Sequence, residues 1–328
     1  MANRPFTQGV HELGNGLYGY VQPDGTWGWS NAGLVVDRGE TLLVDTLMSV
    51  PLTRAMLDDF HRLPGAARID RVLNTHANPD HFFGNVLVAD AEIIATATTH
   101  DEMRGFDPKR LLAMSRDPKA MGEAGEFLYE TMGRKFDFSG VDEVTLPTRT
   151  FEQQLTLQVG DKTVQLRDLG PAHTDSDTIA FCVEDRCVFT GDLLFNEGHP
   201  IMWAGPVENW IKACEFIEAL NPEVVVPGHG PITDVGAVRT LREYFSALRD
   251  AARARFDAGM DWREAARDID YSIGRDWTDP ERIVANVYAL YCQWGMPPVA
   301  GGPFMVFQEM GRYVKELEHN KNGCSHAL

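Results

Sequence analysis

The order of hydrophobic and polar positions predicts alternating strands and helices over the first two thirds of the chain. Short apolar or alternating runs bounded by turn residues are typical of strands, and apolar residues three or four positions apart are typical of an amphipathic helix. The predicted strands cover residues 10–21, 33–36, 41–45, 71–75, 93–96, 143–146, 151–159, 163–169, 178–183, 187–190 and 223–226. The predicted helices in this part cover residues 52–63, 99–104 and 207–220.

Two segments depart from this alternation. Residues 107–135 have an irregular helical pattern with several glycines and methionines, and we interpret them as a lid or a pocket wall. From residue 234 onward the pattern is almost wholly helical, with amphipathic helices predicted at 235–257 and 280–293. The chain is therefore predicted to form an α/β body over residues 1–235 and a helical C-terminal region over residues 236–328 that packs on it.

The composition is typical of a soluble globular protein and excludes two classes of partner. Hydrophobic residues make up 44% of the 328 positions, and the formal net charge is −18. Because this charge repels phosphate groups and the Lys and Arg residues are scattered, neither nucleic acid nor an anionic membrane is expected as a partner. No apolar run approaches the roughly 18 residues that cross a bilayer. Residues 1–6 lack a signal-peptide core and the five cysteines form no C-x-x-C pair, so a cytoplasmic location is expected.

Four segments place histidine or aspartate directly after a predicted strand. They are residues 75–85 with His76, Asp80 and His81, residues 170–175 with His173, residues 189–193 with Asp192, and residues 226–230 with His229. Strand ends of an α/β body meet at one edge of its sheets, so these side chains are expected to converge. Imidazole and carboxylate are the ligands that Zn(II), iron and manganese use in proteins. The four segments together predict a metal site.

The order H-x-x-x-D-H, G-x-x-H-T, T-G-D and P-G-H-G resembles the metallo-β-lactamase superfamily, over about residues 10–235. This resemblance implies an αββα sandwich, in which two mixed sheets pack together with helices outside. It also implies one or two metal ions in the groove at the sheet edges. Zn(II) is the expected ion, with iron or manganese as alternatives.

The resemblance also implies a role for each residue that matches the motifs. His76 and His173 match ligands of a first site, Asp80, His81 and His229 match ligands of a second site, and Asp192 matches the carboxylate that bridges the two ions. Asp45 matches a buried acid that orients a ligand histidine.

One position departs from the family pattern, because Asn78 stands where a further histidine is usual. A neutral amide is a weaker ligand than imidazole, so the first site loses a strong donor. Three interpretations follow: a single ion at Asp80, His81 and His229, two ions of unequal affinity, or a site that has lost catalysis.

The expected reaction is hydrolysis, in which a metal-bound hydroxide attacks an electrophilic carbon. Asp80 is the candidate general base, and Asn78 could donate a hydrogen bond to a developing oxyanion. A small apolar or aromatic substrate is expected. Candidate pocket residues are Trp27, Trp29, Asn31, Phe82, Phe83, His199 and Trp203, with core or interface packing as the equal alternative for each. Met114, Met121 and Met132 are interpreted as core residues.

Several activities remain open at this point. The motif with Asn78 in place of histidine and residues 27–31 have a looser similarity to hydrolytic dehalogenases of chlorinated aromatics in this superfamily. The helical C-terminal region resembles that of glyoxalase II-like thioesterases. Lactone and β-lactam hydrolysis are further alternatives. A di-iron redox protein and a metal-binding protein without turnover are the alternatives from other classes. The charge disfavours the nuclease branch, and a homodimer formed through the C-terminal helices is expected.

Overall fold

Twelve strands form two mixed sheets in the computed structural model, which describes residues 5–270 and 272–324, with side chains up to residue 320. The first sheet has the order β1-β2-β3-β4-β5-β6-β7, with bounds Gly9–Gly14, Leu17–Val21, Ala32–Asp37, Glu40–Val44, Arg71–Leu73, Glu92–Thr96 and Arg149–Phe151. The second has the order β12-β11-β10-β9-β8, with bounds, from β8 to β12, Gln154–Val159, Lys162–Asp168, Thr178–Cys182, Cys187–Phe189 and Val224–Val226.

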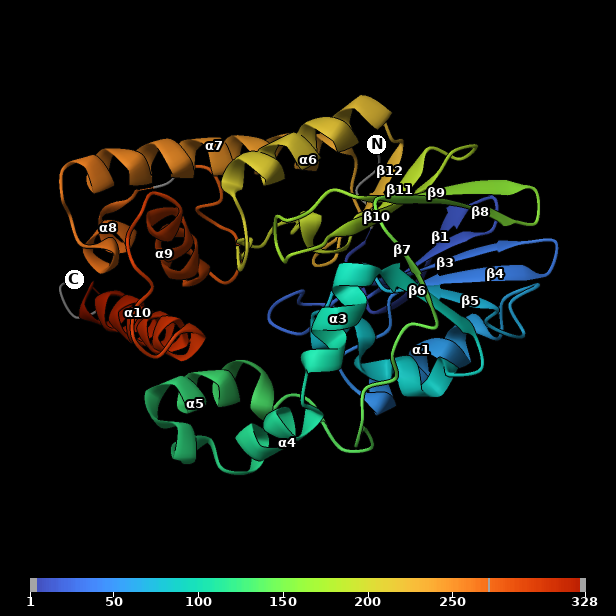
Figure 1. Cartoon of the computed structure of the whole chain (residues 1–328), viewed down its shortest axis with the longest axis horizontal. Coiled ribbons are helices and arrows are strands. Elements are labelled where there is room, and N and C mark those ends of the chain that lie inside the picture. The colour runs from blue at the N-terminus through green and yellow to red at the C-terminus, as the bar shows by residue number, and fades with distance from the viewer. Residues whose placement is uncertain (1–4, 271, 325–328) are drawn as a thin grey trace.

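The helices lie outside the two sheets and at the C-terminal end (Figure 1). They are α1 (Val50–Phe60), α2 (Pro79–Phe82), α3 (Ala97–Gly105), α4 (Pro108–Arg116), α5 (Gly122–Leu128), α6 (Val207–Leu220), α7 (Val235–Asp257), α8 (Trp262–Asp268), α9 (Arg282–Gln293) and α10 (Pro303–Cys324). Short helical turns are η1 (Phe83–Val88), η2 (Pro118–Met121), η3 (Tyr129–Gly133) and η4 (Gly191–Leu193).

The alternation of side chains along each strand produces the layers. In β4, Leu42 and Val44 face the second sheet, whereas Leu43 faces the outer side and packs with Met56 and Phe60 of α1. A strand side chain points to the opposite face from its neighbour, so both faces of this sheet become apolar and need a cover. The second sheet is likewise covered by α6 and α7, which gives the predicted αββα sandwich (Figure 1).

The C-terminal helices join the core that covers the second sheet. Ile283 and Leu290 of α9 and Met310 of α10 are fully buried in the same cluster as Trp210 of α6. The helical C-terminal region is therefore present as expected, while the boundary at residue 235 between it and the sandwich stays a prediction.

Two sequence-based strand predictions differ from the structure. Residues 143–146 form no strand, because the Thr145 carbonyl accepts a hydrogen bond from the Asn85 side chain instead of from a neighbouring strand. The predicted strand 151–159 is divided between β7, which pairs with β6, and β8, which pairs with β9. The chain crosses from the first sheet to the second at this break, which an apolar pattern alone does not reveal.

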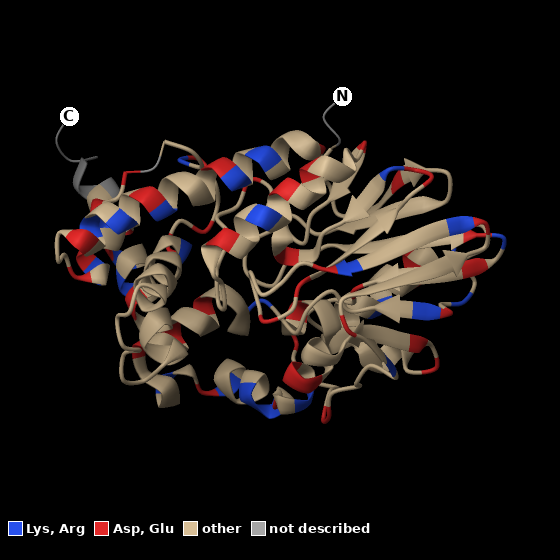
Figure 2. Ribbon diagram, turned by 45° about the horizontal axis from the view of Figure 1, so that its top comes forward, with Lys and Arg blue, Asp and Glu red and all other residues tan. Residues whose placement is uncertain are grey.

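Acidic and basic residues are interspersed over the helices and the strand-connecting turns (Figure 2). No helix of the described residues has the length and apolar character needed to cross a membrane.

Parallel pairing brings distant segments to one end of the sandwich. β4 and β5 run parallel in the first sheet, and β11 and β12 run parallel in the second. Their carboxyl ends lead into Asp45, residues 74–81, residues 190–193 and residues 227–230. The loop between β9 and β10, residues 169–177, supplies His173 at the same end.

The close approach of the sheets depends on Gly33 of β3. A methyl group at this position would lie 2.2 Å from Cε1 of Phe189 in β11. Phe189 is buried between the sheets, so its ring has little room to move, and overpacking of a core typically costs about 1–3 kcal/mol.

We therefore expect Gly33→Ala to lower the free energy of unfolding by about 1–3 kcal/mol, measured by urea denaturation. Gly105→Ala is the control, because a methyl group there meets no atom within 4 Å. Equal stability of the two variants would show that Gly33 is not needed for sheet packing.

Candidate metal centre

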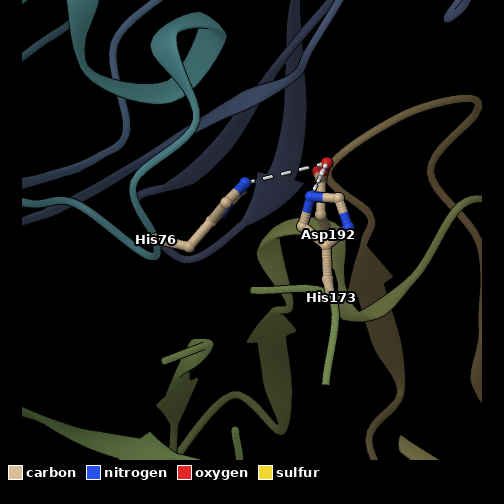
Figure 3. A group of neighbouring side chains, drawn as sticks. All are labelled: His76, His173 and Asp192. Carbon is tan, nitrogen blue, oxygen red and sulfur yellow. Dashed lines mark ion pairs between the residues drawn. The ribbon is translucent and has the colours of Figure 1, made fainter. Parts of the chain in front are cut away.

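The structure brings together all six residues that the sequence motifs single out. They form two groups, His76 with His173 and Asp192, and Asp80 with His81 and His229. Within each group one ligand-type atom per residue lies within 4.8 Å of the others, and all six residues are buried. Figure 3 shows the first group, in which His76 and His173 approach the Asp192 carboxylate from separate segments of the chain.

The two groups have contacts of similar length. In the second group, Nε2 of His229 lies 3.2 Å and Nε2 of His81 lies 3.8 Å from Oδ2 of Asp80. In the first group, Oδ2 of Asp192 lies 3.3 Å from Nε2 of His173 and 3.8 Å from Nε2 of His76. Asp192 also reaches the second group, with its Oδ1 3.1 Å from Nε2 of His81 and its Oδ2 3.5 Å from Nε2 of His229. Asp192 therefore lies between the two groups and contacts both.

Local structure explains how each side chain reaches the centre. Asp80 and His81 lie on α2, which begins with Pro79 after the extended residue Asn78. Asp192 lies on the turn η4, and His229 is held by single bridges to Ser30 and Phe195.

The His229 loop packs tightly against Asp192. A Cβ at Gly228 would lie 2.0 Å from Oδ1 of Asp192, so only glycine fits at this position. The Asn31 amide donates to the carbonyls of Pro227 and Gly230 and fixes the loop from its other side.

Every imidazole of the centre has an acceptor on its Nδ1. His81 Nδ1 lies 2.9 Å from Oδ2 of Asp45, and His229 Nδ1 lies 3.1 Å from the Gly25 carbonyl. His173 Nδ1 lies 2.6 Å from the Ile201 carbonyl. His76 Nδ1 lies 3.0 Å from the Thr75 hydroxyl, whose own proton is donated to Asp45. Because these partners accept, each neutral ring carries its proton on Nδ1 and presents the Nε2 lone pair to the centre.

Asp45 holds the residues that surround the centre in place. Its carboxylate accepts hydrogen bonds from the Thr75 amide, the Thr75 hydroxyl and His81 Nδ1. Its backbone is in the left-handed region, with φ of 64°, a strained conformation for a non-glycine residue that is typical of functional sites. Asp45 contacts ligand-type residues but does not itself face the centre.

Burial and charge shift the pKa values of these groups in opposite directions. Burial disfavours the charged form of Asp80, but His81 and His229 outweigh it and lower the pKa to about 2. Burial also disfavours protonated His229, but Asp192 and Asp80 outweigh it and raise its pKa to about 9. At His173 burial dominates and lowers the pKa. The carboxylates of Asp80 and Asp192 therefore stabilise positive charge at the second group.

The donors of the second group fit a divalent ion. Nε2 of His81 in this group is fully buried and makes no hydrogen bond among the described residues, as is also true of Nε2 of His76 and Oδ1 of Asp192 in the first group. Such atoms normally find a partner, and a metal ion would supply one. Imidazole nitrogens with carboxylate oxygens are the donor set of zinc, iron and manganese sites.

The first group differs because Asn78 adjoins it. Nδ2 of Asn78 lies 2.9 Å from Nε2 of His173, the atom that would face an ion. The first group therefore contains one imidazole whose lone pair already has a partner.

An apolar pocket of about 210 Å³ opens onto the centre. Its lining combines Asn78, Asp80, His173, Asp192 and His229 with Trp27, Gly28, Met48, Pro79, Met132, Phe195, Ile201, Trp203, Arg282 and Phe307. A cavity of roughly 150 Å³ with apolar walls admits benzene. The volume therefore suits a compact molecule of about one ring.

Only some of the residues expected around a pocket line it. Trp27 and Trp203 do, whereas Trp29, Asn31, Phe82, Phe83 and His199 do not, so for these five the alternative of packing within the protein holds. Three of these residues pack on other rings: Trp29 on Phe136, Phe82 on Phe106 and Phe83 on Phe138. Met132 packs against the main core cluster, as interpreted, and in addition lines the pocket from η3. Residues 107–135 thus form part of the pocket wall.

Arg282 and Phe307 line the pocket from the C-terminal helices α9 and α10, and neither was among the residues predicted to do so. The Arg282 guanidinium lies over the rings of Trp27 and Phe195, at 4.5 Å and 5.1 Å. Phe195 in turn stacks on His229 with centroids 5.1 Å apart. The one sequence signal that could have indicated this side of the pocket is Arg282 itself, a charged residue at the start of the otherwise apolar segment that forms α9.

Comparison with known families agrees with the fold. Residues 25–229 match the family profile described as the metallo-beta-lactamase superfamily. This range contains all six residues of the two groups as well as Asp45 and Asn78.

Solved structures show the same fold at low sequence identity. A stereoselective inverting sec-alkylsulfatase, Pisa1 from Pseudomonas sp., is 16% identical with a TM-score of 0.64, over 90% of this chain and 51% of that one. A metallo-beta-lactamase from Pontibacter korlensis is 16% identical with a TM-score of 0.53, over 72% of this chain and 99% of that one. The DIM-1 metallo-beta-lactamase is 16% identical with a TM-score of 0.52, over 74% and 99%. The chain thus spans about half the length of the sulfatase structures.

Asp45→Asn is expected to weaken Zn²⁺ binding about 10- to 100-fold, as loss of a group that orients a ligand typically does. All three partners of the Asp45 carboxylate are donors, so the new NH₂ group must face one of them. Affinity is measured by competition with a chromophoric chelator.

The matched control is Asp70→Asn, because Asp70 accepts the amide and hydroxyl of Thr41 at the opposite end of the same strands. We expect the control to bind Zn²⁺ as tightly as the unchanged chain. Equal affinity of both variants would contradict the orienting role of Asp45.

Proposed function

The chain belongs to the metallo-beta-lactamase superfamily, and from this premise we propose that it is a metal-dependent hydrolase of a small apolar or aromatic substrate. The proposed ligands are Asp80, His81 and His229, together with Asp192. The observation that carries the proposal is that two buried carboxylates converge with the Nε2 atoms of His81 and His229. In both rings a hydrogen bond at Nδ1 leaves the Nε2 lone pair free to bind a metal ion. Zn²⁺ is the proposed ion, with iron or manganese as alternatives for the same donors.

A bound divalent ion would supply a nucleophile at neutral pH by lowering the pKa of a water molecule toward 7. The chain's own groups provide the rest of the proposed chemistry. Asp80 lies at the floor of the pocket and can accept a proton from that water. Asn78 lines the pocket and can donate an amide N–H to negative charge that develops on the substrate.

The pocket supports the proposed substrate class. Its aromatic walls come from Trp27, Phe195, Trp203 and Phe307, and Phe307 packs against both tryptophans at 6.2 Å and 5.4 Å. Such a surface favours a flat, apolar body over an extended polar one. An aryl halide or a small aromatic ester, lactone or thioester fits this description, and the dehalogenase alternative gains support from the aromatic lining.

Location and assembly are also proposed. The described cysteines, Cys182, Cys187, Cys214 and Cys292, are all free thiols, which is usual in the reducing cytoplasm. A homodimer through the C-terminal helices is proposed because Phe304 of α10 exposes 49% of its surface.

The direct experiment is metal analysis of the purified chain together with a panel of aryl-halide, aryl-ester, lactone, thioester, β-lactam and alkyl-sulfate substrates. We expect bound zinc and turnover of a compact aromatic member. Two irons with a visible charge-transfer band and no hydrolysis would contradict the proposal in favour of a redox protein. A chain without bound metal would indicate a protein without turnover.

Phe307→Ala is expected to raise the KM for an aromatic substrate about tenfold, because loss of a buried ring costs on the order of 1–3 kcal/mol of binding. Zinc content should not change, since a phenylalanine side chain supplies no metal ligand. Steady-state kinetics with the best substrate of the panel measures this.

Phe304→Ala is the matched control on the same helix, because Phe304 is outside the pocket lining and largely exposed. Its KM should equal that of the unchanged chain. A KM that rises equally in both variants would show that α10 acts through its fold and not through the Phe307 ring.

A further inference from the structure

The unusual feature of the centre is the contact between Asn78 and His173. Both nitrogens of the His173 ring are engaged, with Nδ1 at 2.6 Å from the Ile201 carbonyl and Nε2 at 2.9 Å from Nδ2 of Asn78. A carbonyl oxygen can only accept, so Nδ1 carries the proton and Nε2 is an acceptor. The Asn78 amide must then present its NH₂ group to His173, and this sets the orientation of the amide.

The backbone position of Asn78 would normally give its side chain a different partner. Asn78 is the residue that precedes α2, with φ of −92° and ψ of 138°, yet its side chain makes no capping hydrogen bond to that helix. Asparagine is among the preferred residues at such a position because its oxygen normally accepts a helix amide, which stabilises by about 1 kcal/mol. Here the amide is turned away from the helix and toward His173.

The His173 ring is held in place by its own surroundings. Asp177 accepts the amides of Ala172 and Thr174 on either side of His173. The ring also packs edge-on against Phe195 and Trp210, at 5.6 Å and 5.9 Å between centroids. His173 is therefore a fixed acceptor, and a contact with it fixes Asn78.

We infer that His173 is a positioning residue for the Asn78 amide and that the group of His76, His173 and Asp192 holds no metal ion. With the His173 lone pair engaged, only His76 and Asp192 remain, and Asp192 is shared with the second group. Two donors are fewer than the three protein ligands of catalytic zinc sites. The amide's second N–H and its oxygen have no partner among the described residues, and Asn78 lines the pocket.

The fixed Asn78 amide restricts which substrates the pocket can bind. Fixed by His173, the Asn78 amide presents one N–H donor and one carbonyl acceptor to a ligand beside Asp80. The inference deepens the proposed function and rests on it: the substrate class is narrowed to compact aromatic molecules with a hydrogen-bonding group next to the reacting carbon.

The test compares Zn²⁺ bound per chain after equilibration with excess Zn²⁺ and removal of free ion. The unchanged chain, His173→Gln and His173→Ala should each retain one ion, whereas Asn78→His should bind two. The double variant Asn78→His with His173→Gln should return to one ion. Two ions in the unchanged chain, with one lost in His173→Gln, would overturn the inference and show that His173 is a ligand.

A second readout separates positioning from a merely structural role. With nitrogen-labelled histidine and an NMR-active cadmium isotope in place of zinc, we expect coupling to cadmium at His81 and His229 and none at His76 and His173. The Asn78→Ala variant should shift the His173 Nε2 resonance, because the hydrogen bond to it is lost. Cadmium coupling at all four rings, or an unchanged His173 resonance, would contradict the inference.

Steady-state kinetics can test whether a conservative substitution of His173 preserves turnover. Glutamine at position 173 keeps an acceptor for the Asn78 amide and alanine does not, so kcat in His173→Gln should exceed that in His173→Ala by tenfold or more at equal zinc content. Equal kcat values would overturn the positioning role. A chain that binds no ion at all would overturn the proposed function as well, whereas two ions with intact turnover would overturn this inference alone.

Discussion

The structure depends on the burial of two carboxylates, Asp80 and Asp192, at the junction of the sheets. Removing a carboxylate from water is costly unless positive charge compensates it. His81 and His229 provide part of that compensation when protonated, and both have a raised pKa because the carboxylates outweigh their burial. A divalent ion would provide it more completely and would release both imidazoles to act as ligands. The fold can hold this arrangement because parallel strand pairs in both sheets end at the same edge.

Positioning in this centre is carried out by residues one layer further out. Asp45 fixes the Nδ1 proton of His81, and the Gly25 carbonyl does the same for His229. Asn78 contacts His173 of the first group and lines the pocket. The two groups thus have the same residue types, but only the first has an amide hydrogen-bonded to one of its imidazoles.

The convergence of six residues could be predicted because each ligand-type residue follows an apolar strand and strand ends share an edge. The sandwich could be predicted only through the resemblance of the motifs to the metallo-β-lactamase superfamily. The sequence did not allow the pocket to be predicted. Arg282 and Phe307 come from helices at the far end of the chain, and Met132 comes from an irregular segment, so their meeting depends on how those helices pack and not on local pattern. The strand predicted at 143–146 failed for a similar reason, since pairing partners decide whether an apolar run becomes a strand. The dimer, the location and the ligand roles of the six residues stay predictions.

The most direct test of the central claim is anomalous diffraction from crystals of the zinc-loaded chain, recorded at the zinc absorption edge. The account predicts one strong peak enclosed by the side chains of Asp80, His81, Asp192 and His229, with Asn78 still in contact with His173. Absence of a peak between these four side chains, in crystals that contain zinc elsewhere, would contradict it.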